Sequence, residues 1–472
     1  MKKKFDAIVI GAGISGLTCA FNLHQKGNDV LVLEKSDHIG GAISSFRTDG
    51  YLVEAGPNST LDTTPLLGRL MDESGCIDTL QYARTESDTR YIVKNGTLTP
   101  LPMTPGEFIR TKLFSLSAKL RLFREPFIRA APADADETIA EFVLRRLGRE
   151  FLDYAINPFV AGVYAGSPEQ LSVRAAFPKL HALEQKYGSL MKGQIKGAKE
   201  RKRNAEQSKQ TAKMFSYHDG MESLPKAIAE KLDGKIRTGC RSITIGPGSS
   251  HYPVTYERNN EIFSVESPVV ILSVPAYAAG AIMEPLSAAV SRNLDSIPYP
   301  PCAVVVTGYL QENIRHPLNG FGCLIPQKEN RKILGTIFTS TIFTHRCPEG
   351  KVLLTSFVGG SRNPELALLP KEKLLRLVQE ELTLLVGART EPDFVHTTQW
   401  EKAIPQYNTG HLERMTVLDA FENQHEGFYF CANYRGGISV GDCVKSADET
   451  ARRASAHLKK NSEAGIGNPE KD

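Results

Sequence analysis

The chain has 472 residues, of which 41% are hydrophobic, and a net charge of +4 from 57 basic and 53 acidic side chains. This length allows about two or three domains with large cores, and the near balance of charge gives no reason to expect a nucleic-acid partner. The 8 cysteines are scattered without a CxxC pair. Their scatter argues against a zinc site or a disulfide framework and favours a reducing compartment.

No stretch of the sequence resembles a targeting or membrane-spanning segment. The basic start, Met1–Lys4, runs directly into the first predicted strand, so we expect no signal or transit peptide. The longest uncharged stretch, 267–283, is broken by Pro268 and Pro275, and it predicts a buried strand and a turn. We therefore expect a cytoplasmic protein.

The first motif lies between Phe5 and Glu34 and predicts a strand, a turn, a helix and a second strand. An apolar run over 7–10 is followed by G-x-G-x-x-G, and a helical pattern continues to Gly27. The second strand, 29–33, ends on Glu34. This order is typical of a Rossmann-like unit, in which the turn binds a pyrophosphate and the terminal acid binds ribose hydroxyls.

Each glycine of this turn has a physical role. Gly11 permits the tight turn, Gly13 lets the pyrophosphate approach the backbone, and Gly16 lets the helix pack closely on the strand. The helix N-terminus adds free N–H groups and a partial positive charge. Because Glu34 argues against a 2′-phosphate, the sequence predicts a dinucleotide without one.

Two further glycine turns occur at opposite ends of the chain. Gly40 and Gly41 follow the first unit, and an ordinary glycine turn is the better explanation of this pair when it is taken alone. Near the other end, a predicted strand over 427–433 leads into Arg435-Gly436-Gly437 and a helix that continues to Ala456. The N-terminus of that helix can offer N–H groups to a flavin carbonyl or to the pyrophosphate.

A basic amphipathic helix is predicted over 109–127, with Pro126 expected to end or kink it. Its apolar residues recur at intervals of three and four: Ile109, Leu113, Leu116, Leu120, Phe123 and Phe127. A core-facing helix with a solvated basic side is the commoner explanation, and contact with an anionic membrane surface is the alternative. The basic run over 192–213 predicts a solvated or disordered loop.

Four longer stretches complete the set of motifs. They are NPFVAGVYAGSPEQLSVRAAFP (157–178), FSYHDGMESLPKAI (215–228), GFGCLIP (320–326) and TSFVGGSRNPELA (355–367). Together with the opening unit, the glycine pair at 40–41 and the C-terminal FYFCANYRGGISVGDCV, they resemble the flavin amine oxidase superfamily. Within it, they are most similar to the oxygen-dependent protoporphyrinogen and coproporphyrinogen oxidases, over nearly the whole chain. The resemblance implies an α/β fold with two dinucleotide-binding motifs for FAD, a mixed-sheet substrate domain and a helical membrane-associating domain.

The resemblance also implies which residues bind FAD. The pyrophosphate and ribose would contact Gly11, Ala12, Gly13, Ile14, Ser15, Gly16, Glu34 and Lys35. The ribityl chain and the ring would lie beside Gly40, Gly41, Gly56, Pro57 and Asn58, and the far side would be closed by Gly436, Gly437, Val440, Gly441 and Asp442. The family usually has a Val on the adenine side, where this chain has Cys240, so that contact would run through the backbone.

For the substrate, the resemblance implies a tetrapyrrole pocket. The sequence contains no Ser-His-Asp set, metal cluster or paired carboxylates that would be catalytic, so we expect no catalytic side chain beyond the flavin and no metal. Arg90 would bind a propionate, and Phe159 and Gly162 would form a wall. Leu324, Ile337 and Phe357 would sandwich the macrocycle. Taken without the resemblance, these last three are better explained by core packing, and Arg90 by a solvated strand position.

The implied reaction is the FAD-dependent oxidation of protoporphyrinogen IX to protoporphyrin IX in porphyrin biosynthesis, with oxygen as acceptor and hydrogen peroxide as product. A hydride would pass from a meso carbon to flavin N5, and the protein would chiefly orient the substrate. Coproporphyrinogen III, which carries more carboxylates, is the alternative substrate. Remoter alternatives are another flavin amine oxidase, a carotenoid desaturase, or a non-enzymatic protein that keeps the nucleotide fold.

The expected FAD-binding domain is assembled from 1–85, 215–275 and 400–472. The substrate domain would comprise 86–108 and 276–399, and a helical domain would span 109–214. The expected partners are the tetrapyrrole and molecular oxygen, with peripheral contact on the inner face of the cell membrane as a further option. A homodimer is left open, and nucleic acid is not expected.

Overall fold

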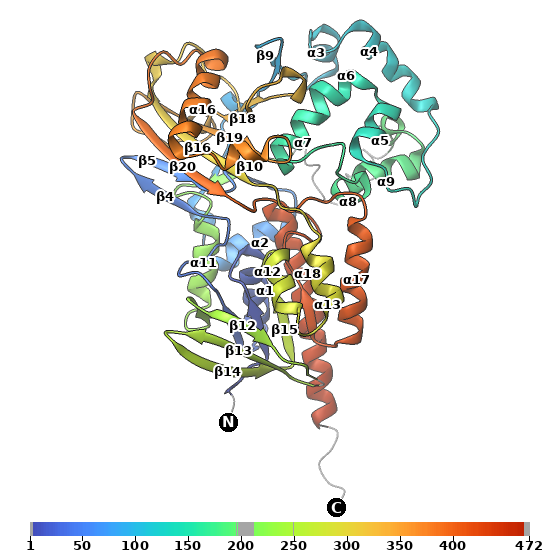
Figure 1. Ribbon diagram of the computed structural model, residues 1–472, viewed down its shortest axis with the longest axis vertical. Helices are drawn as coiled ribbons and strands as arrows, with labels where there is room; N and C mark the ends of the chain where they lie inside the picture. Colours follow the sequence, from blue (N-terminus) through green and yellow to red (C-terminus); the bar gives the residue numbers. More distant parts are fainter. Residues whose placement is uncertain (1–2, 195, 197–211, 249, 467–472) are drawn as a thin grey trace, which may run out of the picture.

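The computed structural model of the chain describes residues 3–194, 196, 212–248 and 250–466. It has a lower part built on a five-stranded sheet and an upper part built on a seven-stranded sheet (Figure 1). Most of the short helices lie beside the upper sheet. The predicted α/β class is therefore confirmed.

The five-stranded sheet is parallel throughout and joins distant parts of the chain. In spatial order its strands are β11 (Ile236–Arg237), β3 (Val30–Leu33), β2 (Ala7–Ile10), β15 (Val269–Leu272) and β21 (Phe428–Phe430). All of these except β11 are buried along their whole lengths, as expected of parallel strands covered on both faces. Their runs of Val, Ile, Leu and Phe form the core of the lower part.

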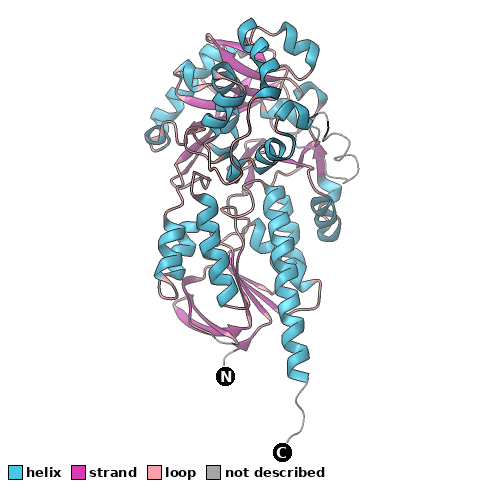
Figure 2. Ribbon diagram, turned by 90° about the vertical axis from the view of Figure 1, so that its right-hand side faces the viewer, coloured by secondary structure: helices cyan, strands magenta, loops and turns pink. Residues whose placement is uncertain are grey.

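Helices α1 (Ile14–His24) and α18 (Val440–Ile466) pack side by side against one face of this sheet (Figure 1). Figure 2 shows α18 as the long helix that runs down the lower part. The same core cluster includes residues of α2 (Pro65–Ser74) and α11 (Ser223–Lys231). The opposite face is covered by β1 (Lys3–Lys4), β14 (Glu261–Ser267), β13 (Tyr252–Arg258) and β12 (Arg241–Ile245), with α12 (Ala276–Met283), α13 (Ala288–Asp295) and α17 (His411–Gln424).

The seven-stranded sheet of the upper part is mixed. In spatial order its strands are β20 (Phe394–Trp400), β16 (Cys302–Leu310), β19 (Lys351–Gly359), β18 (Ile333–Ile337), β17 (Gly322–Leu324), β8 (Arg90–Lys94) and β9 (Thr97–Pro100). β17 and β8 run parallel, and the other neighbours are antiparallel. One face packs on α16 (Lys371–Val386), so the other face remains for the helical region and the lower part.

The helical region contains α3 (Pro105–Arg110), α4 (Leu116–Arg121), α5 (Ile139–Arg146), α6 (Arg149–Phe151), α7 (Asn157–Tyr164), α8 (Val173–Ala176) and α9 (Pro178–Tyr187). A 3₁₀ turn, Leu122–Phe127, follows α4, and a π-helical turn, Leu152–Ile156, precedes α7. Shorter elements elsewhere are β4 (Ser45–Thr48), β5 (Tyr51–Glu54), β6 (Thr60–Leu61), β7 (Leu80–Tyr82), β10 (Met214–Tyr217), α14 (Thr339–Ile342) and α15 (Pro364–Ala367).

The predicted amphipathic helix over 109–127 is wrong in two respects. It is three short elements, because the chain is extended at Thr111 and a new helix is capped by the Ser115 side chain. Its apolar residues do not share one core-facing side: Leu113 is buried in a core cluster, whereas Ile109 is 73% exposed and Phe127 is 86% exposed. The apolar residues therefore recur at intervals of three and four although the segment is not one continuous helix.

The basic run, the absence of a membrane-spanning segment and the domain limits are the remaining expectations. The predicted loop over 192–213 lies largely outside the described residues. Within the described residues, no helix is both long and apolar enough to cross a membrane. The proposed domain limits stay a prediction.

Candidate functional site

The first glycine turn joins β2 to α1 through tight backbone contacts. Gly11 has φ +107°, and a Cβ there would lie 2.3 Å from the carbonyl oxygen of Ser273. A Cβ on Gly16 would lie 2.0 Å from the carbonyl oxygen of Gly11. No described atom lies within 4 Å of a Cβ placed on Gly13. Gly11 and Gly16 are thus required by the fold itself, whereas Gly13 faces open space.

The N-terminus of α1 is prepared to bind an anion. Gly13 is its N-cap residue, and no described side chain caps this end or places an acid in the first turn. The first N–H groups of a helix have no intrahelical partner and carry a partial positive charge. Together with the open space beside Gly13, they fit the pyrophosphate of a dinucleotide.

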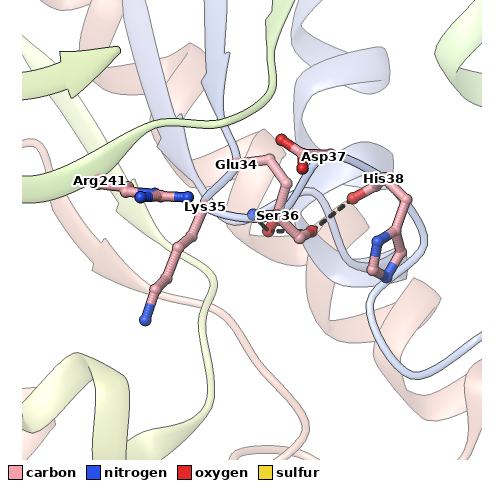
Figure 3. A pocket seen from close by; sticks show the side chains of 6 residues that line it. All are labelled: Glu34, Lys35, Ser36, Asp37, His38 and Arg241. Atoms are coloured by element: carbon pink, nitrogen blue, oxygen red, sulfur yellow. Dashed lines mark hydrogen bonds between the residues drawn. The ribbon is translucent and has the colours of Figure 1, made fainter. Parts of the chain in front are cut away.

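Glu34 lies at the end of β3 beside this turn. Its Oε2 accepts the Ala12 N–H at 2.7 Å, and its Oε1 accepts the N–H and the hydroxyl of Ser36 at 2.9 and 2.8 Å. An open pocket of about 680 Å³ adjoins it, lined by Glu34, Lys35, Ser36, Asp37, His38 and Arg241 (Figure 3). The carboxylate is therefore fixed at the edge of a pocket large enough for the adenosine half of the cofactor.

Cys240 contacts Glu34 through its backbone. The Cys240 N–H donates to the carbonyl oxygen of Glu34 at 2.8 Å, and the buried sulfur points to the carbonyl of Arg237. The structure thus places Cys240 beside Glu34, and its backbone contact with the adenine stays a prediction.

The glycine pair at 40–41 lies against the first turn. Gly13 and Gly40 form a parallel bridge, and a Cβ on Gly41 would lie 3.2 Å from the Gly13 Cα. The turn that begins at Gly56 is equally close to residue 42, because a Cβ on Gly56 would lie 1.9 Å from the carbonyl oxygen of Ala42. The structure thus brings three predicted cofactor segments together.

Asn58 and Pro57 follow Gly56 in this turn. Asn58 is buried, and its Oδ1 has no hydrogen-bond partner among the described residues. A buried, unsatisfied amide oxygen costs free energy unless a ligand or water pairs with it. This atom is consistent with a polar ligand at the turn.

The C-terminal glycine turn meets the N-terminal one. Val440 and Cys443 at the start of α18 share a buried cluster with Ile14 and Leu17 of α1, and Asn22 Nδ2 lies 3.2 Å from Asp448 Oδ1. Gly436 and Gly437 have φ values of +83° and +122°. The structure thus places the first turns of α1 and α18 against each other.

Two predicted residues of this segment are held by neighbours. Asp442 accepts the Ser439 hydroxyl at 2.6 Å, and a Cβ on Gly441 would lie 3.1 Å from Thr63 Oγ1. The open cradle beside Gly13, the bare helix end and the unpaired Asn58 oxygen fit a dinucleotide that reaches from Glu34 toward this C-terminal turn.

Sequence reasoning missed Tyr407, which holds the C-terminal turn. Its hydroxyl donates to the carbonyl oxygen of Asn433 at 2.6 Å and accepts the Gly437 N–H at 3.0 Å. Burial raises the pKa of Tyr407 well above its ordinary value, so the hydroxyl keeps its proton. No local pattern marks such a residue, because its partners lie far away in the sequence.

Arg90, Gly322 and Ile337 form one row across the seven-stranded sheet. Arg90 on β8 pairs with Gly322 on β17, which in turn pairs with Ile337 on β18. Paired residues point to the same face of a sheet. Arg90 and Ile337, both predicted to contact the substrate, therefore share a face.

The next row contains two more predicted substrate residues. Leu324 on β17 pairs with Gly335 on β18, and Gly335 pairs with Phe357 on β19. Because Leu324 is two residues beyond Gly322, this row points the same way as the first. The four side chains thus belong to one face.

Helix α7 packs on this same face through Gly162. A Cβ on Gly162 would lie 2.6 Å from Leu324 Cδ2, so a larger residue would displace that leucine. Phe159, one turn earlier, is 44% exposed and lies near Phe177, with ring centroids 5.8 Å apart. Gly162 therefore lies against Leu324 on the sheet face, whereas Phe159 lies at the edge of the set of predicted substrate residues.

Arg90 has no carboxylate in an ion pair with it among the described residues. Its guanidinium lies over the Phe321 ring, 5.7 Å from the centroid. An arginine held by an aromatic ring and free of an acidic partner can bind an external carboxylate.

Phe357 links this face to the cofactor segments. It packs against a buried cluster that includes Tyr51 and Val53, next to the turn at 56–58. Trp400, which also contacts this cluster, donates its indole N–H to the carbonyl oxygen of Ala55 at 2.8 Å. The candidate substrate face and the candidate flavin turn are thus neighbours.

Comparison with known proteins gives one consistent result. The sequence matches the family described as flavin containing amine oxidoreductase over residues 14–455. The chloroplastic protoporphyrinogen oxidase of Nicotiana tabacum is 34% identical over 474 residues, which cover 96% of this chain and 86% of the relative. The coproporphyrinogen III oxidase of Bacillus subtilis is 26% identical over 471 residues, 96% of this chain and 99% of the relative.

Solved structures show the same fold. A protein from Exiguobacterium sp., provisionally named protoporphyrinogen oxidase, has a TM-score of 0.80 and 24% identity, and the match covers 97% of this chain and 99% of that one. Putrescine oxidase bound to putrescine has a TM-score of 0.69 and 17% identity, with 96% and 99% of the two chains covered. The chain belongs to the flavin containing amine oxidoreductase family and, within it, to the family that contains the protoporphyrinogen oxidases.

Proposed function

We propose that this protein is an FAD-dependent oxidase that converts protoporphyrinogen IX to protoporphyrin IX, with oxygen as acceptor and hydrogen peroxide as product. The observation that carries the proposal is the shared face of Arg90, Leu324, Ile337 and Phe357, next to the turn at 56–58. One cation among apolar side chains suits a macrocycle with carboxylates on one edge and vinyl groups on the other. FAD, when bound, supplies the two-electron acceptor.

The residues of the chain would bind and orient rather than transfer protons. Arg90 would hold a propionate of the substrate, and the apolar side chains of Leu324, Ile337 and Phe357 would exclude water from the ring. Gly13, Glu34 and the helix ends would hold the dinucleotide, and the turn at 56–58 and the C-terminal glycines would lie along its flavin half. Holding one reacting carbon near the flavin in a dry site can supply much of the rate acceleration.

Anaerobic mixing with each porphyrinogen tests the proposal. The yellow absorbance band of the holoprotein should bleach on addition of protoporphyrinogen IX and return when oxygen is admitted, with porphyrin fluorescence as the product signal. Bleaching by a polyamine but by neither porphyrinogen would contradict it. A colourless protein that binds no FAD would instead support a non-enzymatic function.

The same experiment measures substrate preference. Coproporphyrinogen III is the second candidate, because relatives of that name match nearly the whole chain at 26% and 27% identity. A substrate with more carboxylates calls for more cations around the ring, and Arg90 is the cation that the proposal places against a propionate. We expect kcat/KM to be higher for protoporphyrinogen IX.

We also propose that the segment 103–127 contacts an anionic membrane surface. Its exposed apolar side chains are Met103, Ile109, Leu116, Leu120, Phe123 and Phe127. Exposed basic residues alternate with them: Arg110, Lys112, Arg121 and Arg124. Apolar side chains with interspersed cations are the pattern of an element that lies in the bilayer interface.

Vesicle co-sedimentation tests the membrane proposal. Replacing Phe123 and Phe127 together by Ser should reduce binding to vesicles rich in anionic lipid. The matched control is Ile262→Ser, because Ile262 is 82% exposed but lies on β14 of the lower part. Equal loss in both variants, or binding that is unchanged in the first, would contradict the proposal.

The domain limits are proposed as given above, and they leave α12 and α13, which pack on the five-stranded sheet, within 276–399. An FAD-binding domain from 1–85, 215–275 and 400–472 would contain the five-stranded sheet, and 86–108 with 276–399 would contain the seven-stranded one. Residues 109–214 would form the membrane-contacting helical domain.

A further inference from the structure

Two cysteines from opposite ends of the chain meet beneath the candidate FAD site. Cys19 lies on α1, and Cys431 directly follows β21. Their Sγ atoms are 3.6 Å apart and both residues are buried. Among the described residues, which include all eight cysteines, no other pair of sulfur atoms is in hydrogen-bond contact.

We propose that Cys19 and Cys431 form a reversible disulfide under peroxide, and that this bond locks the two halves of the cofactor site together. A disulfide has an S–S length of about 2.05 Å, so the two sulfurs must approach each other by well over 1 Å. The bond would join α1, which carries the first glycine turn, to β21, which leads into the second.

The backbone of Cys431 is fixed on both sides. Its N–H donates to the carbonyl oxygen of Leu272 at 3.1 Å, and its own carbonyl accepts the Ser273 hydroxyl at 2.7 Å. Cys19 lies within α1, and its Sγ is 3.3 Å from the carbonyl oxygen of Ala447 on α18. A covalent bond between the sulfurs would therefore tie together elements that are already packed, rather than distort a loop.

The surroundings distinguish the two thiols. Hydrogen bonding from Cys19 lowers the pKa of the Cys431 thiol, helped by the hydroxyls of Thr450 and Ser446 and opposed by burial. Burial raises the pKa of Cys19. The thiolate is the form that attacks peroxide, so Cys431 is the attacking group and Cys19 is the resolving one.

The reaction balances with hydrogen peroxide as the oxidant. The Cys431 thiolate attacks one peroxide oxygen, the O–O bond breaks, and the leaving hydroxide takes up the proton that Cys431 lost on ionising, which gives water and a sulfenic acid on Cys431. Cys19 sulfur then attacks the sulfenic sulfur, the S–O bond breaks, and the Cys19 proton leaves with the hydroxyl as water. Two thiols are oxidised and one peroxide is reduced to two waters.

Hydrogen peroxide is also the product of the oxidase reaction proposed above. An enzyme in turnover would therefore produce the oxidant that forms its own Cys19–Cys431 disulfide. The inference does not depend on that activity, because reagent peroxide tests it directly. Failure of the porphyrinogen assay would therefore leave the disulfide test unaffected.

The experiment exposes the FAD-loaded protein to hydrogen peroxide, alkylates the remaining thiols and maps the peptides by mass spectrometry. We expect one intramolecular crosslink between Cys19 and Cys431 that dithiothreitol reverses. Because the bond would hold α1 and the end of β21 together while FAD leaves, we expect FAD to dissociate about tenfold more slowly from the oxidised protein. Flavin fluorescence after dilution measures this rate.

Two variants complete the test. Cys431→Ala should give neither the crosslink nor the slower release, whereas Cys302→Ala, which removes a buried thiol of the upper sheet, should retain both. If Cys431→Ala does not fold, the peptide map of the unmodified protein still decides the matter. Absence of the 19–431 crosslink in the folded holoprotein overturns the proposal, and so does a crosslink that leaves FAD release unchanged.

Discussion

The backbone N–H of Gly40 donates to the carbonyl oxygen of Ala12 at 2.8 Å. This bond fastens the glycine pair at 40–41 to the first glycine turn, so that the two turns form one continuous surface beside the N-terminus of α1. In the sequence alone the glycine pair cannot be told from an ordinary glycine turn. The structure gives it a specific role, because it lies against the first glycine turn.

Gly13→Ala should separate cofactor binding from folding. Since no described atom lies within 4 Å of a Cβ at this position, the variant should keep the wild-type unfolding midpoint as apoprotein. The added methyl would occupy the approach of the pyrophosphate, so we expect FAD affinity to fall by about tenfold or more.

Two other glycine-to-alanine variants serve as controls for Gly13→Ala. Gly68→Ala adds a methyl to open space on α2 and should leave FAD affinity unchanged, while the unfolding midpoint rises slightly because alanine is the better helix former. Gly16→Ala should reduce stability, because its Cβ would meet the Gly11 carbonyl oxygen at 2.0 Å. Normal FAD content in Gly13→Ala would argue against a pyrophosphate at this turn.

Glu34→Gln should weaken FAD binding while the pocket keeps its shape. The amide is neutral and replaces an acceptor oxygen with a donor, so it binds ribose hydroxyls and the Ala12 N–H less well. We expect the Kd for FAD to rise about tenfold. Asp37→Asn, which neutralises another acid of the same pocket, is the matched control and should raise it less. Equal effects would show that the pocket's charge, and not the Glu34 contact, matters.

Arg90→Ala should raise KM for the porphyrinogen by about tenfold and slow flavin reduction at saturating substrate much less. The reason is that Arg90 would bind a propionate remote from the reacting carbon. Arg90→Lys keeps the charge but not the planar guanidinium, so its KM should lie between those of the wild type and Arg90→Ala. Stopped-flow measurement of flavin reduction over a range of substrate concentrations separates substrate binding from the rate of reduction. An unchanged KM with a collapsed turnover rate would count against this role of Arg90.

The buried Glu54 predicts a pH dependence of stability. Glu54 accepts hydrogen bonds from Ser45 and the Met221 N–H and pairs with Arg346 at 3.4 Å. Burial raises the pKa of Glu54 from 4.5 to about 7, against these contacts. The folded state thus binds the proton more tightly than the unfolded state does, so this group's stabilising contribution is lost as the pH rises from 4.5 through 7.

Urea unfolding at several pH values checks this prediction against Glu54→Gln, which cannot titrate. The free energy of unfolding of the wild type should fall relative to the variant by on the order of 3 kcal/mol across that interval. Parallel curves for the two proteins would mean that the pKa of Glu54 is the same in the folded and the unfolded state, and would contradict the prediction.

Local sequence determined the parts of this protein that depend on neighbouring residues. The turn over 11–16, the acid at 34 and most of the strands follow from residue spacing and apolar runs, because backbone sterics and alternating burial act over a few residues. The family motifs extended this to the candidate site residues. Neither could show that Tyr407 bonds Gly437, since those contacts join segments that the chain order keeps apart.

Only the tertiary structure decided which apolar residues are covered. Leu113 and Phe127 fit the same periodic pattern, yet one is buried and the other is exposed. The same holds for Cys19 and Cys431, which no spacing rule connects and which the sheet order β2–β15–β21 brings together. Burial depends on what the rest of the chain places against a surface, and that is a property of the whole fold.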